Sequence, residues 1–267
     1  MALPALHAFL APLLAQRRIC RSEFLRQQSA VAAITDKTRG AATRLAGLSR
    51  LDDFQALLVR RKSGPRRRAD LRERCIGLPA SHLDSGAARV DALRGATAVL
   101  QSEGLGYHEV DWVALPARDE LTLPSAYATE IAALQEGGVD AVYVRGPAGL
   151  EAARAADMRM LVDISAERDP WVRINTALLR TVTVSERLLR EHAEAVERQS
   201  REPALSLPAH MTLDEAALCV LEALKTFMLR WNFVRSDFKI RSWADWQPPA
   251  RTGSCELLHA GPVIQFI

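Results

Sequence analysis

Short apolar runs that end at proline or glycine alternate with longer amphipathic segments through the middle of the chain. Runs of this kind are typical of strands buried on both faces, and the amphipathic segments have the helical period. The region from about residue 73 to residue 165 therefore predicts a βαβαβαβ unit, an α/β fold with a parallel sheet covered by helices on both faces. The predicted strands are Cys75–Leu78, Asp111–Leu115, Ala141–Val144 and Met158–Ile164.

Small polar residues and glycines mark the ends of the predicted helices. The first helix of this region ends at Gly104 and has three candidate N-caps, which are Ser81, Asp84 and Ser85. The second begins at Ser125 and ends at the glycine pair 137–138. A long helix nearer the C-terminus opens on Thr212 and Glu215, the spacing of a capping box. Its apolar stripe predicts a side that faces the core and consists of Ala216, Val220, Leu224, Phe227, Met228 and Trp231.

Further strands are predicted on either side of the alternating region. Residues 44–48 and 54–59 precede it and are separated by a polar turn. Residues 177–185 follow it and alternate with β-branched side chains. The chain after residue 185 is helical in pattern, except for a tail, 251–267, that has no clear period.

Composition places the chain among globular proteins, because 48% of its 267 residues are apolar and 25% are charged. The net charge of +3 is too small to indicate a nucleic-acid partner. A local basic cluster has two interpretations, a patch for polyanions or a solvated loop between structural units. The loop is favoured because Gly64-Pro65 marks a turn and no aromatic residues are interleaved. The cluster is Arg60, Arg61, Lys62, Arg66, Arg67 and Arg68.

Metal and cofactor chemistry find no support in the sequence. The four cysteines are far apart, without the spacing of a zinc site, and no dinucleotide, P-loop or hydrolase motif is present. No window reaches the roughly 20 apolar residues of a membrane span, so membrane insertion is not expected. The apolar N-terminus lacks a cationic start and contains Pro4 and Pro12, so it is a poor export signal. A cytoplasmic location is expected for the chain as it stands, and a periplasmic one if the true start lies upstream.

The order of these elements resembles the nitrate/sulfonate/taurine-type substrate-binding proteins of ABC transporters, within the subgroup that includes the hydroxybiphenyl sulfinate desulfinase. The resemblance covers roughly residues 24 to 248 and rests on the order and spacing of several segments. They are TRGAATRLAGLSRLDDFQALLVR, ADLRERCIGLP, LQEGGVDAVYV followed by RMLVDI, LRTVTVSERLLREHAEAV and FMLRWNFVRSDFKIRSWADW.

The resemblance implies a two-lobed periplasmic-binding-protein type II fold with the ligand between the lobes. Residues 1–59 and 186–267 would form a discontinuous first lobe, and 60–185 a complete second lobe. Strands near 54–59 and 181–185 would be the hinges. Residues 1–23 differ from the family, which implies a truncated or rebuilt first lobe with lower order there.

The desulfinase chemistry that the resemblance implies is incomplete. The family enzyme uses a cysteine and a histidine, to which nothing in this chain aligns, followed by an Arg-X-Gly-Gly motif. Residues 26–29 read Arg-Gln-Gln-Ser and keep only the arginine, and the neighbours of Cys20 do not match those of the nucleophile. We therefore expect no catalytic residue, and we expect Arg26 to bind an anion.

Further candidate ligand residues lie at the exits of the predicted strands. Ser81 and His82 follow the first strand, and Arg145-Gly146 follows the third at the turn into an alanine-rich helix. Ligands bind where parallel strands of an α/β sheet end. Asn175-Thr176 precedes the return strand and could add hydrogen bonds from the hinge side. The competing interpretation makes Ser81 a cap, His82 a solvated side chain and Arg145 an exposed turn residue.

The leading hypothesis is a cofactor-free binding protein of an ABC-type uptake system. It would hold a small organic anion, such as a sulfonate, a sulfinate or a nitrate-like ion, and present it to a permease or sense it. The alternatives are a desulfinase-like C–S hydrolase and an inactive fragment of either protein.

Overall fold

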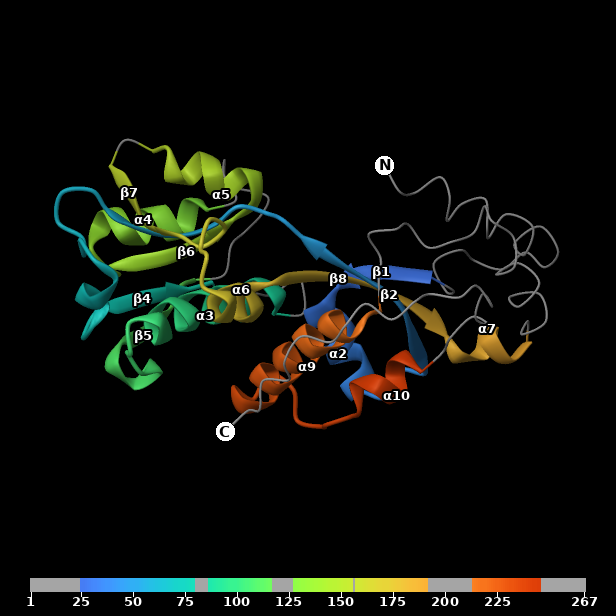
Figure 1. Ribbon diagram of the computed structural model, residues 1–267. Coiled ribbons are helices and arrows are strands. Elements are labelled where there is room, and N and C mark those ends of the chain that lie inside the picture. The colour runs from blue at the N-terminus through green and yellow to red at the C-terminus, as the bar shows by residue number, and fades with distance from the viewer. Residues whose placement is uncertain (1–24, 80–85, 117–126, 156, 192–212, 246–267) are drawn as a thin grey trace.

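The computed structural model describes residues 25–79, 86–116, 127–155, 157–191 and 213–245. Within these ranges the chain forms two separate β-sheets with helices packed against them, which confirms the predicted α/β class. Figure 1 shows the five-stranded sheet at one end of the molecule and the three-stranded sheet at the other. None of the helices in these ranges combines the length and the apolarity that a bilayer span requires.

The five-stranded sheet has the order β5-β4-β6-β3-β7. Strand β4 pairs in parallel with both β5 and β6, as the alternating pattern predicted. Strand β3 runs antiparallel to both of its neighbours, so the sheet as a whole is mixed rather than parallel. The strands are β3 (Gln55–Arg60), β4 (Cys75–Leu78), β5 (Asp111–Ala114), β6 (Ala141–Arg145) and β7 (Met158–Asp163).

The direction of β3 follows from its burial and from the place where it enters the sheet. Leu57 and Val59 belong to the core on one face, and Ala56 and Leu58 to the core on the other. A strand that is apolar on both faces is stable only where other elements cover both faces of the sheet. The chain reaches β3 from the other sheet at the edge where β6 ends, because Gln55 pairs with Arg145. Strand β3 must therefore run opposite to its neighbours.

Helices cover both faces of this sheet, as predicted. Leu93, Ala96 and Leu100 of α3 and Val172 of α6 are buried on one face, whereas Leu134 of α4 and Ala152 of α5 are buried on the other. Two 3-10 helices complete the connections. The bounds are α3 (Ala87–Ser102), α4 (Ala128–Glu136), α5 (Gly146–Ala153), α6 (Pro170–Thr176), η2 (Arg68–Leu71) and η3 (Tyr107–Glu109).

The three-stranded sheet is antiparallel, with β8 between β1 and β2. Helices α2, α9 and α10 share one core with this sheet, which includes Ile34, Leu45, Leu224 and Trp243. The bounds are β1 (Leu25–Ser29), α2 (Ala30–Thr38), β2 (Thr43–Leu51), β8 (Leu178–Ser185), α7 (Glu186–Glu191), α9 (Glu215–Arg230) and α10 (Ile240–Ala244).

The described chain passes between the sheets twice. It leaves the three-stranded sheet between Leu51 and Gln55 and returns to it between Thr176 and Leu178. The predicted strand at 54–59 thus lies in the five-stranded sheet, and that at 181–185 lies in the three-stranded sheet. The division into lobes at 59/60 and 185/186 stays a prediction. The expectation of lower order in residues 1–23 concerns a segment outside the described residues.

The helix ends differ in part from the predicted ones. Helix α3 begins after Gly86, whose φ is +81° and which offers no side-chain cap, and α4 begins after Tyr127. Helix α9 is capped by Asp214, whose carboxylate accepts a hydrogen bond from the Ala217 amide at 2.7 Å. The predicted caps lie outside the described residues. They are Ser81, Asp84, Ser85, Ser125 and Thr212.

The stripe on α9 was predicted correctly at its C-terminal half only. Leu224 and Met228 are buried, but Ala216 is exposed. Leu221 and the charged Lys225 are buried in its stead. The Lys225 ammonium reaches Asp237 at 2.6 Å and the Phe238 carbonyl at 2.5 Å, so its charge is satisfied by the segment that follows α9. A buried lysine that is paired in this way has no signal in the apolar period.

Gly95 allows α3 to approach the sheet closely. A Cβ at this position would lie 2.5 Å from Cε2 of Tyr143 on β6. Alanine normally stabilises a helix interior by about 1 kcal/mol relative to glycine. We expect Gly95→Ala to lower the free energy of unfolding instead, by about 1–3 kcal/mol, because the contact overpacks the core. Urea denaturation followed by circular dichroism measures this change.

The control is the same substitution in a Tyr143→Leu background, where no ring opposes the new methyl group. There Gly95→Ala should cost clearly less than in the parent chain. An equal loss in both backgrounds would show that the contact with Tyr143 is not the cause.

Candidate functional site

Arg145 and Gly146 lie where β6 ends and α5 begins. The Arg145 guanidinium forms an ion pair of 3.0 Å with Asp91 of α3, and only 7% of the Asp91 side chain is exposed. The prediction placed Arg145 at this strand exit but did not include its carboxylate partner. The partner means that Arg145 is fixed in position and largely neutralised before any ligand arrives.

The surroundings of this pair set the charge of Arg145. Burial lowers the pKa of Arg145, but the negative charge of Asp91 and smaller contributions that include Asp53 raise it, and the net result is an increase. The backbone is held as well, because the Tyr127 hydroxyl donates to the Arg145 carbonyl at 3.1 Å and accepts from its amide at 2.9 Å. Arg145 is thus a permanent cation on a rigid strand end.

Gly146 provides the sharp turn after Arg145. Its φ is +67°, in the left-handed region that favours glycine, and its amide donates to the Phe54 carbonyl at 2.7 Å. No atom lies within 4 Å of the position that a Cβ would take. The turn is therefore hydrogen-bonded to the segment that passes between the sheets, and it leaves open space beside the backbone.

A polar cavity of about 190 Å³ lies at the same edge, where the chain crosses between the sheets. Thr176, one of the predicted ligand residues, lines it together with Gln55, whose Oε1 accepts a hydrogen bond of 2.8 Å from the buried Tyr143 hydroxyl. The remaining lining residues come from the ends of β2, β7 and α6. They are Arg50, Leu51, Asp52, Asp53, Ile164, Ser165, Arg173 and Ala177.

Two arginines give this crossing cavity its basic side. Arg50 lies 3.9 Å from Asp52 and donates to the Arg173 carbonyl at 3.4 Å. The Asp52 side chain is 96% exposed, so the pair holds Arg50 only weakly. Arg50 and Arg173 were missed in the sequence. Arg50 falls in the stretch predicted as a polar turn, although β2 extends through it, and Arg173 lies in a short helix, where arginine is ordinary.

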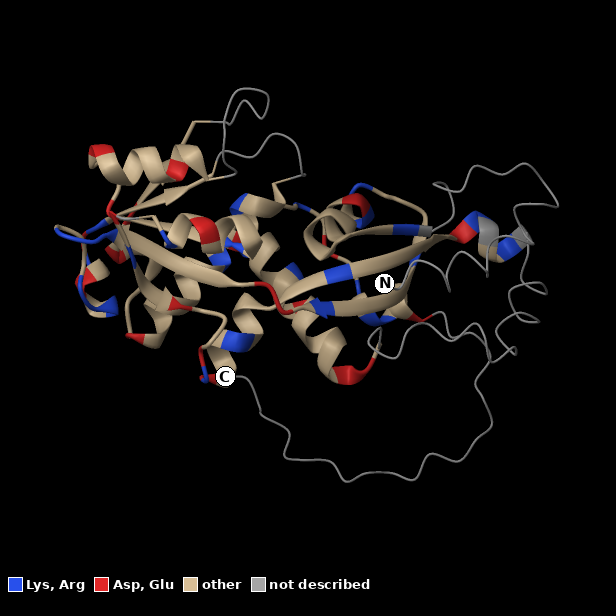
Figure 2. Cartoon of the chain, turned by 90° about the horizontal axis from the view of Figure 1, so that it is seen from above, with Lys and Arg blue, Asp and Glu red and all other residues tan. Residues whose placement is uncertain are grey.

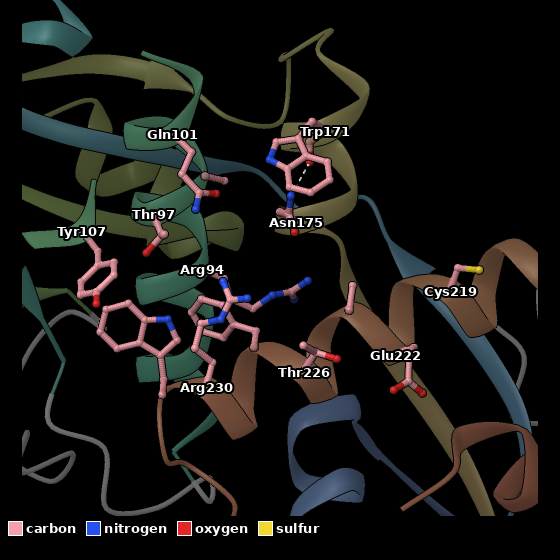
Figure 3. Close-up of a pocket in the computed structure, with 14 residues that line it drawn as sticks. Arg94, Thr97, Gln101, Tyr107, Trp171, Asn175, Cys219, Glu222, Thr226 and Arg230 are labelled. Atoms are coloured by element: carbon pink, nitrogen blue, oxygen red, sulfur yellow. Dashed lines mark hydrogen bonds between the residues drawn. The ribbon is translucent and has the colours of Figure 1, made fainter. Parts of the chain in front are cut away.

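Asn175 faces a different space from Thr176. It lines a second cavity of about 410 Å³ between α3, α6 and α9, which Figure 3 shows. Its side-chain amide donates to the Trp171 carbonyl at 3.0 Å. The Thr176 hydroxyl donates to the Val172 carbonyl at 2.8 Å, so both residues are tied to their own helix.

Arg26 is remote from the crossing cavity. It pairs with Thr183 in the half of β8 that is farther from the crossing, and its guanidinium contacts Asp36 at 2.7 Å. The N-terminus of α2, which follows this motif, is capped by its own Ser29, whose hydroxyl accepts from the Ala32 amide at 3.2 Å. Of the predicted ligand residues, Arg145, Gly146 and Thr176 are brought to one edge. Ser81 and His82 lie outside the described residues.

The basic cluster behaves as a structural loop. Arg60 reaches Asp140 at 3.5 Å, and Arg68 reaches Glu167 at 2.5 Å. Arg67 pairs with Asp70, and the hydrogen bonds that Asp70 accepts from this segment lower its pKa. Figure 2 shows acidic positions, in red, along the chain near the basic ones, in blue, at this end of the molecule. The pairing agrees with the loop interpretation rather than with a polyanion patch.

A metal centre is not formed by the residues that the structure describes, since no three His, Cys, Asp or Glu side chains gather in one place. The expectation that the protein needs no metal or cofactor stays a prediction.

Comparison with solved structures shows the fold. The desulfurization enzyme DszB matches with a TM-score of 0.59 and 20% identity, over 91% of this chain and 92% of its own. The periplasmic aliphatic sulphonate-binding protein SsuA from Escherichia coli matches with a TM-score of 0.58 and 15% identity, over 98% and 92%. The alkanesulfonate-binding protein SsuA from Xanthomonas axonopodis pv. citri, bound to MOPS, gives 0.52 and 17%, over 88% and 83%.

The chain thus has the periplasmic-binding-protein type II fold, and the resemblance inferred from the sequence is confirmed at the level of structure. No protein-family model matches the sequence. No curated protein is significantly similar to it.

The pair between Asp91 and Arg145 gives a test of the strand exit. Asp91→Asn leaves a largely buried guanidinium without its counter-charge, so we expect the free energy of unfolding to fall by on the order of 3 kcal/mol. Asp52→Asn, at an exposed carboxylate near the same edge, should change it by no more than about 0.5 kcal/mol. Urea denaturation measures both. Equal effects of the two substitutions would show that the Asp91 pair does not hold this edge together.

Proposed function

We propose that the protein binds a small organic anion of the sulfonate, sulfinate or nitrate-like class in the crossing cavity between its two sheets. The observation that carries the proposal is the position of this polar cavity, at the carboxyl ends of β6 and β7 and at the passage between sheets. Open α/β sheets bind ligands outside the carboxyl ends of their strands. Two proteins with this fold are sulfonate-binding proteins.

The size of the cavity favours a ligand of a few atoms. Sites for drug-sized ligands measure roughly 300–1,000 Å³, whereas this cavity measures about 190 Å³. A sulfonate or carboxylate head group with a short aliphatic body suits that space. The Ser165 and Thr176 side chains on the lining are additional polar groups beside the arginines.

The charges of the cavity can rearrange around an anion. Arg50 and Asp52 form a loose, exposed pair, and such pairs contribute only about 0.2–1 kcal/mol. An oxyanion that replaces Asp52 at Arg50 therefore loses little and gains a charge-assisted hydrogen bond. Arg145 pairs with Gln55 in the sheet and stays bound to Asp91, so it contributes little net charge to the cavity.

Residues from both sides of the passage line the cavity, so an anion held there contacts both sheets. Arg50 belongs to β2 in the three-stranded sheet, whereas Gln55 and Ser165 belong to or follow strands of the five-stranded sheet. A ligand that bridges two units favours the state in which they are close. Delivery of the captured anion to a permease, or sensing of it, is the function that this arrangement supports best.

The desulfinase alternative lacks support from the described cysteines. Cys75 and Cys219 are free thiols, and neither forms a hydrogen bond with His108, the histidine within the described ranges. The similarity to DszB shows the fold alone. The enzyme hypothesis stays a prediction.

Isothermal titration calorimetry with methanesulfonate tests the proposal, and the uncharged dimethyl sulfone is the matched control ligand. We expect saturable binding of methanesulfonate only. Arg50→Gln and Arg173→Gln should each weaken it about tenfold or more, because each removes a charged donor. Arg154→Gln, at the exposed arginine that follows α5 as its C-cap, is the matched control variant and should bind as the parent does.

Taurine, nitrate and acetate in the same assay define the anion class. The proposal is contradicted if the folded protein binds none of methanesulfonate, nitrate, acetate and the zwitterion taurine, or if Arg50→Gln and Arg173→Gln bind methanesulfonate as tightly as Arg154→Gln does.

A further inference from the structure

The larger cavity, of about 410 Å³, lies on a different side of α3 from the sheet. One face of α3 carries Ala87 and Val90 in its N-terminal half, and these residues are buried in the core that α2 and α9 share. The same face carries Arg94, Thr97 and Gln101 in its C-terminal half, where it lines the cavity. The face is thus closed by apolar packing at one end and left open at the other, and we call the open part the α3–α9 cavity.

Polar groups on α3 point to a ligand in this space. Thr97 is only 7% exposed. Its hydroxyl is buried and has no hydrogen-bond partner in the described part of the structure. Buried polar groups without a partner are rare, because each costs about 1–3 kcal/mol. Gln101, four residues further along α3, has a side-chain amide on the same lining. A ligand oxygen in the cavity would give the Thr97 hydroxyl its missing partner.

Arg94 makes the base of the cavity positive. It is 4% exposed and donates to the Ala177 carbonyl at 3.1 Å and to the Ile174 carbonyl at 3.4 Å. Burial lowers the pKa of Arg94 to about 10, which still leaves it charged at neutral pH. Its hydrogen-bond partners are neutral carbonyl groups, and the nearby carboxylate of Asp91 is already paired with Arg145, so these three side chains together keep a net positive charge.

A second cation lies on α9. Arg230 lines the cavity, is exposed, and forms no ion pair with any other described residue. The one acidic side chain on the described lining is Glu222, which is bound to Lys225 at 2.7 Å. The lining therefore has a surplus of positive charge, which favours an anionic ligand.

Aromatic rings form the walls of the cavity. Tyr107 is 55% exposed and Trp171 is 48% exposed, which is unusual for such large apolar side chains. Figure 3 shows them on η3 and α6, on either side of the polar groups of α3. Trp231 completes one wall, with its ring centroid 5.2 Å from that of Tyr107, and Phe227 lies 5.9 Å from Trp231.

We propose that the α3–α9 cavity binds a small aromatic compound that carries one anionic oxygen group, either a carboxylate or a sulfonate. The ring occupies the space between Trp171 and the wall formed by Tyr107 and Trp231, and the anionic group meets Arg230 and Arg94. The volume of about 410 Å³ lies within the range of sites for two-ring ligands, whereas the crossing cavity is too small for them. The proposal is independent of the function proposed for the crossing cavity.

Naphthalene-1-sulfonate is the probe, and 1-naphthalenemethanol is its uncharged counterpart. Isothermal titration calorimetry with the full chain should give saturable binding of the sulfonate at one site and at least about tenfold weaker binding of the alcohol, because the alcohol lacks the charge that the arginines bind. Equal affinity for the two compounds would overturn the proposal, and so would an absence of saturable binding.

Three substitutions locate the site. Trp171→Ala should weaken the affinity for naphthalene-1-sulfonate about tenfold, since stacking contributes at this level, and Arg230→Gln should weaken it about fivefold or more. Thr97→Val keeps the shape of the side chain and removes the hydroxyl, and we expect a loss of about threefold together with a higher thermal midpoint of the free protein. Arg154→Gln, on the opposite face of the five-stranded sheet, should leave the affinity unchanged.

The Arg50→Gln variant separates the two proposals. It should reduce binding of methanesulfonate and leave binding of naphthalene-1-sulfonate unchanged. If Arg50→Gln weakens the aromatic probe while Trp171→Ala and Arg230→Gln do not, the probe occupies the crossing cavity and the α3–α9 site is refuted. Sedimentation velocity tests whether a second copy of the chain occupies the cavity instead. A dimer that Trp171→Ala abolishes, in a protein that does not bind the probe, would mean that the exposed rings contact a second copy of the chain.

Discussion

Burial of α3 on two sides is the constraint on which the arrangement of this protein depends. On one side Gly95 brings the helix against Tyr143 of β6, so closely that no methyl group fits between them. On another side Ala87 and Val90 pack into the core of α2 and α9, which belongs with the three-stranded sheet. One helix therefore sets both the thickness of the five-stranded unit and its contact with the rest of the chain. Helix α9 supports the contact, because Phe227 packs against both cores.

Two largely buried arginines have different kinds of partner. Asp91 and Arg145 form an ion pair at the end of β6, where removal of either partner would leave the other charge largely buried. Arg94, one turn further along α3, donates to backbone carbonyls, and the carboxylate that acts on it, Asp91, is already paired with Arg145. The first arrangement gives rigidity at the edge where strands end. The second gives a positive potential to a space that is lined by aromatic rings.

Elements with a regular apolar period could be predicted from the sequence, whereas features that arise from tertiary pairing could not. Residues 75–78 and 141–144 are strands because they are apolar runs between turns, and the structure agrees within a residue. The antiparallel direction of β3 has no signature in its own residues, since it follows from where the chain enters the sheet. Arg145 was identified by its position after a strand, but Asp91 lies in the middle of a helix. Only the fold shows that Asp91 faces the end of β6.

The two passages of the chain between the sheets have a consequence for how the two cavities communicate. The crossing cavity lies at these passages, and the α3–α9 cavity lies where the two units touch along α3 and α9. Any rotation of one sheet relative to the other must alter the shapes of both spaces at once. Occupancy of one cavity and affinity at the other would then be thermodynamically linked, with the same coupling free energy in either direction.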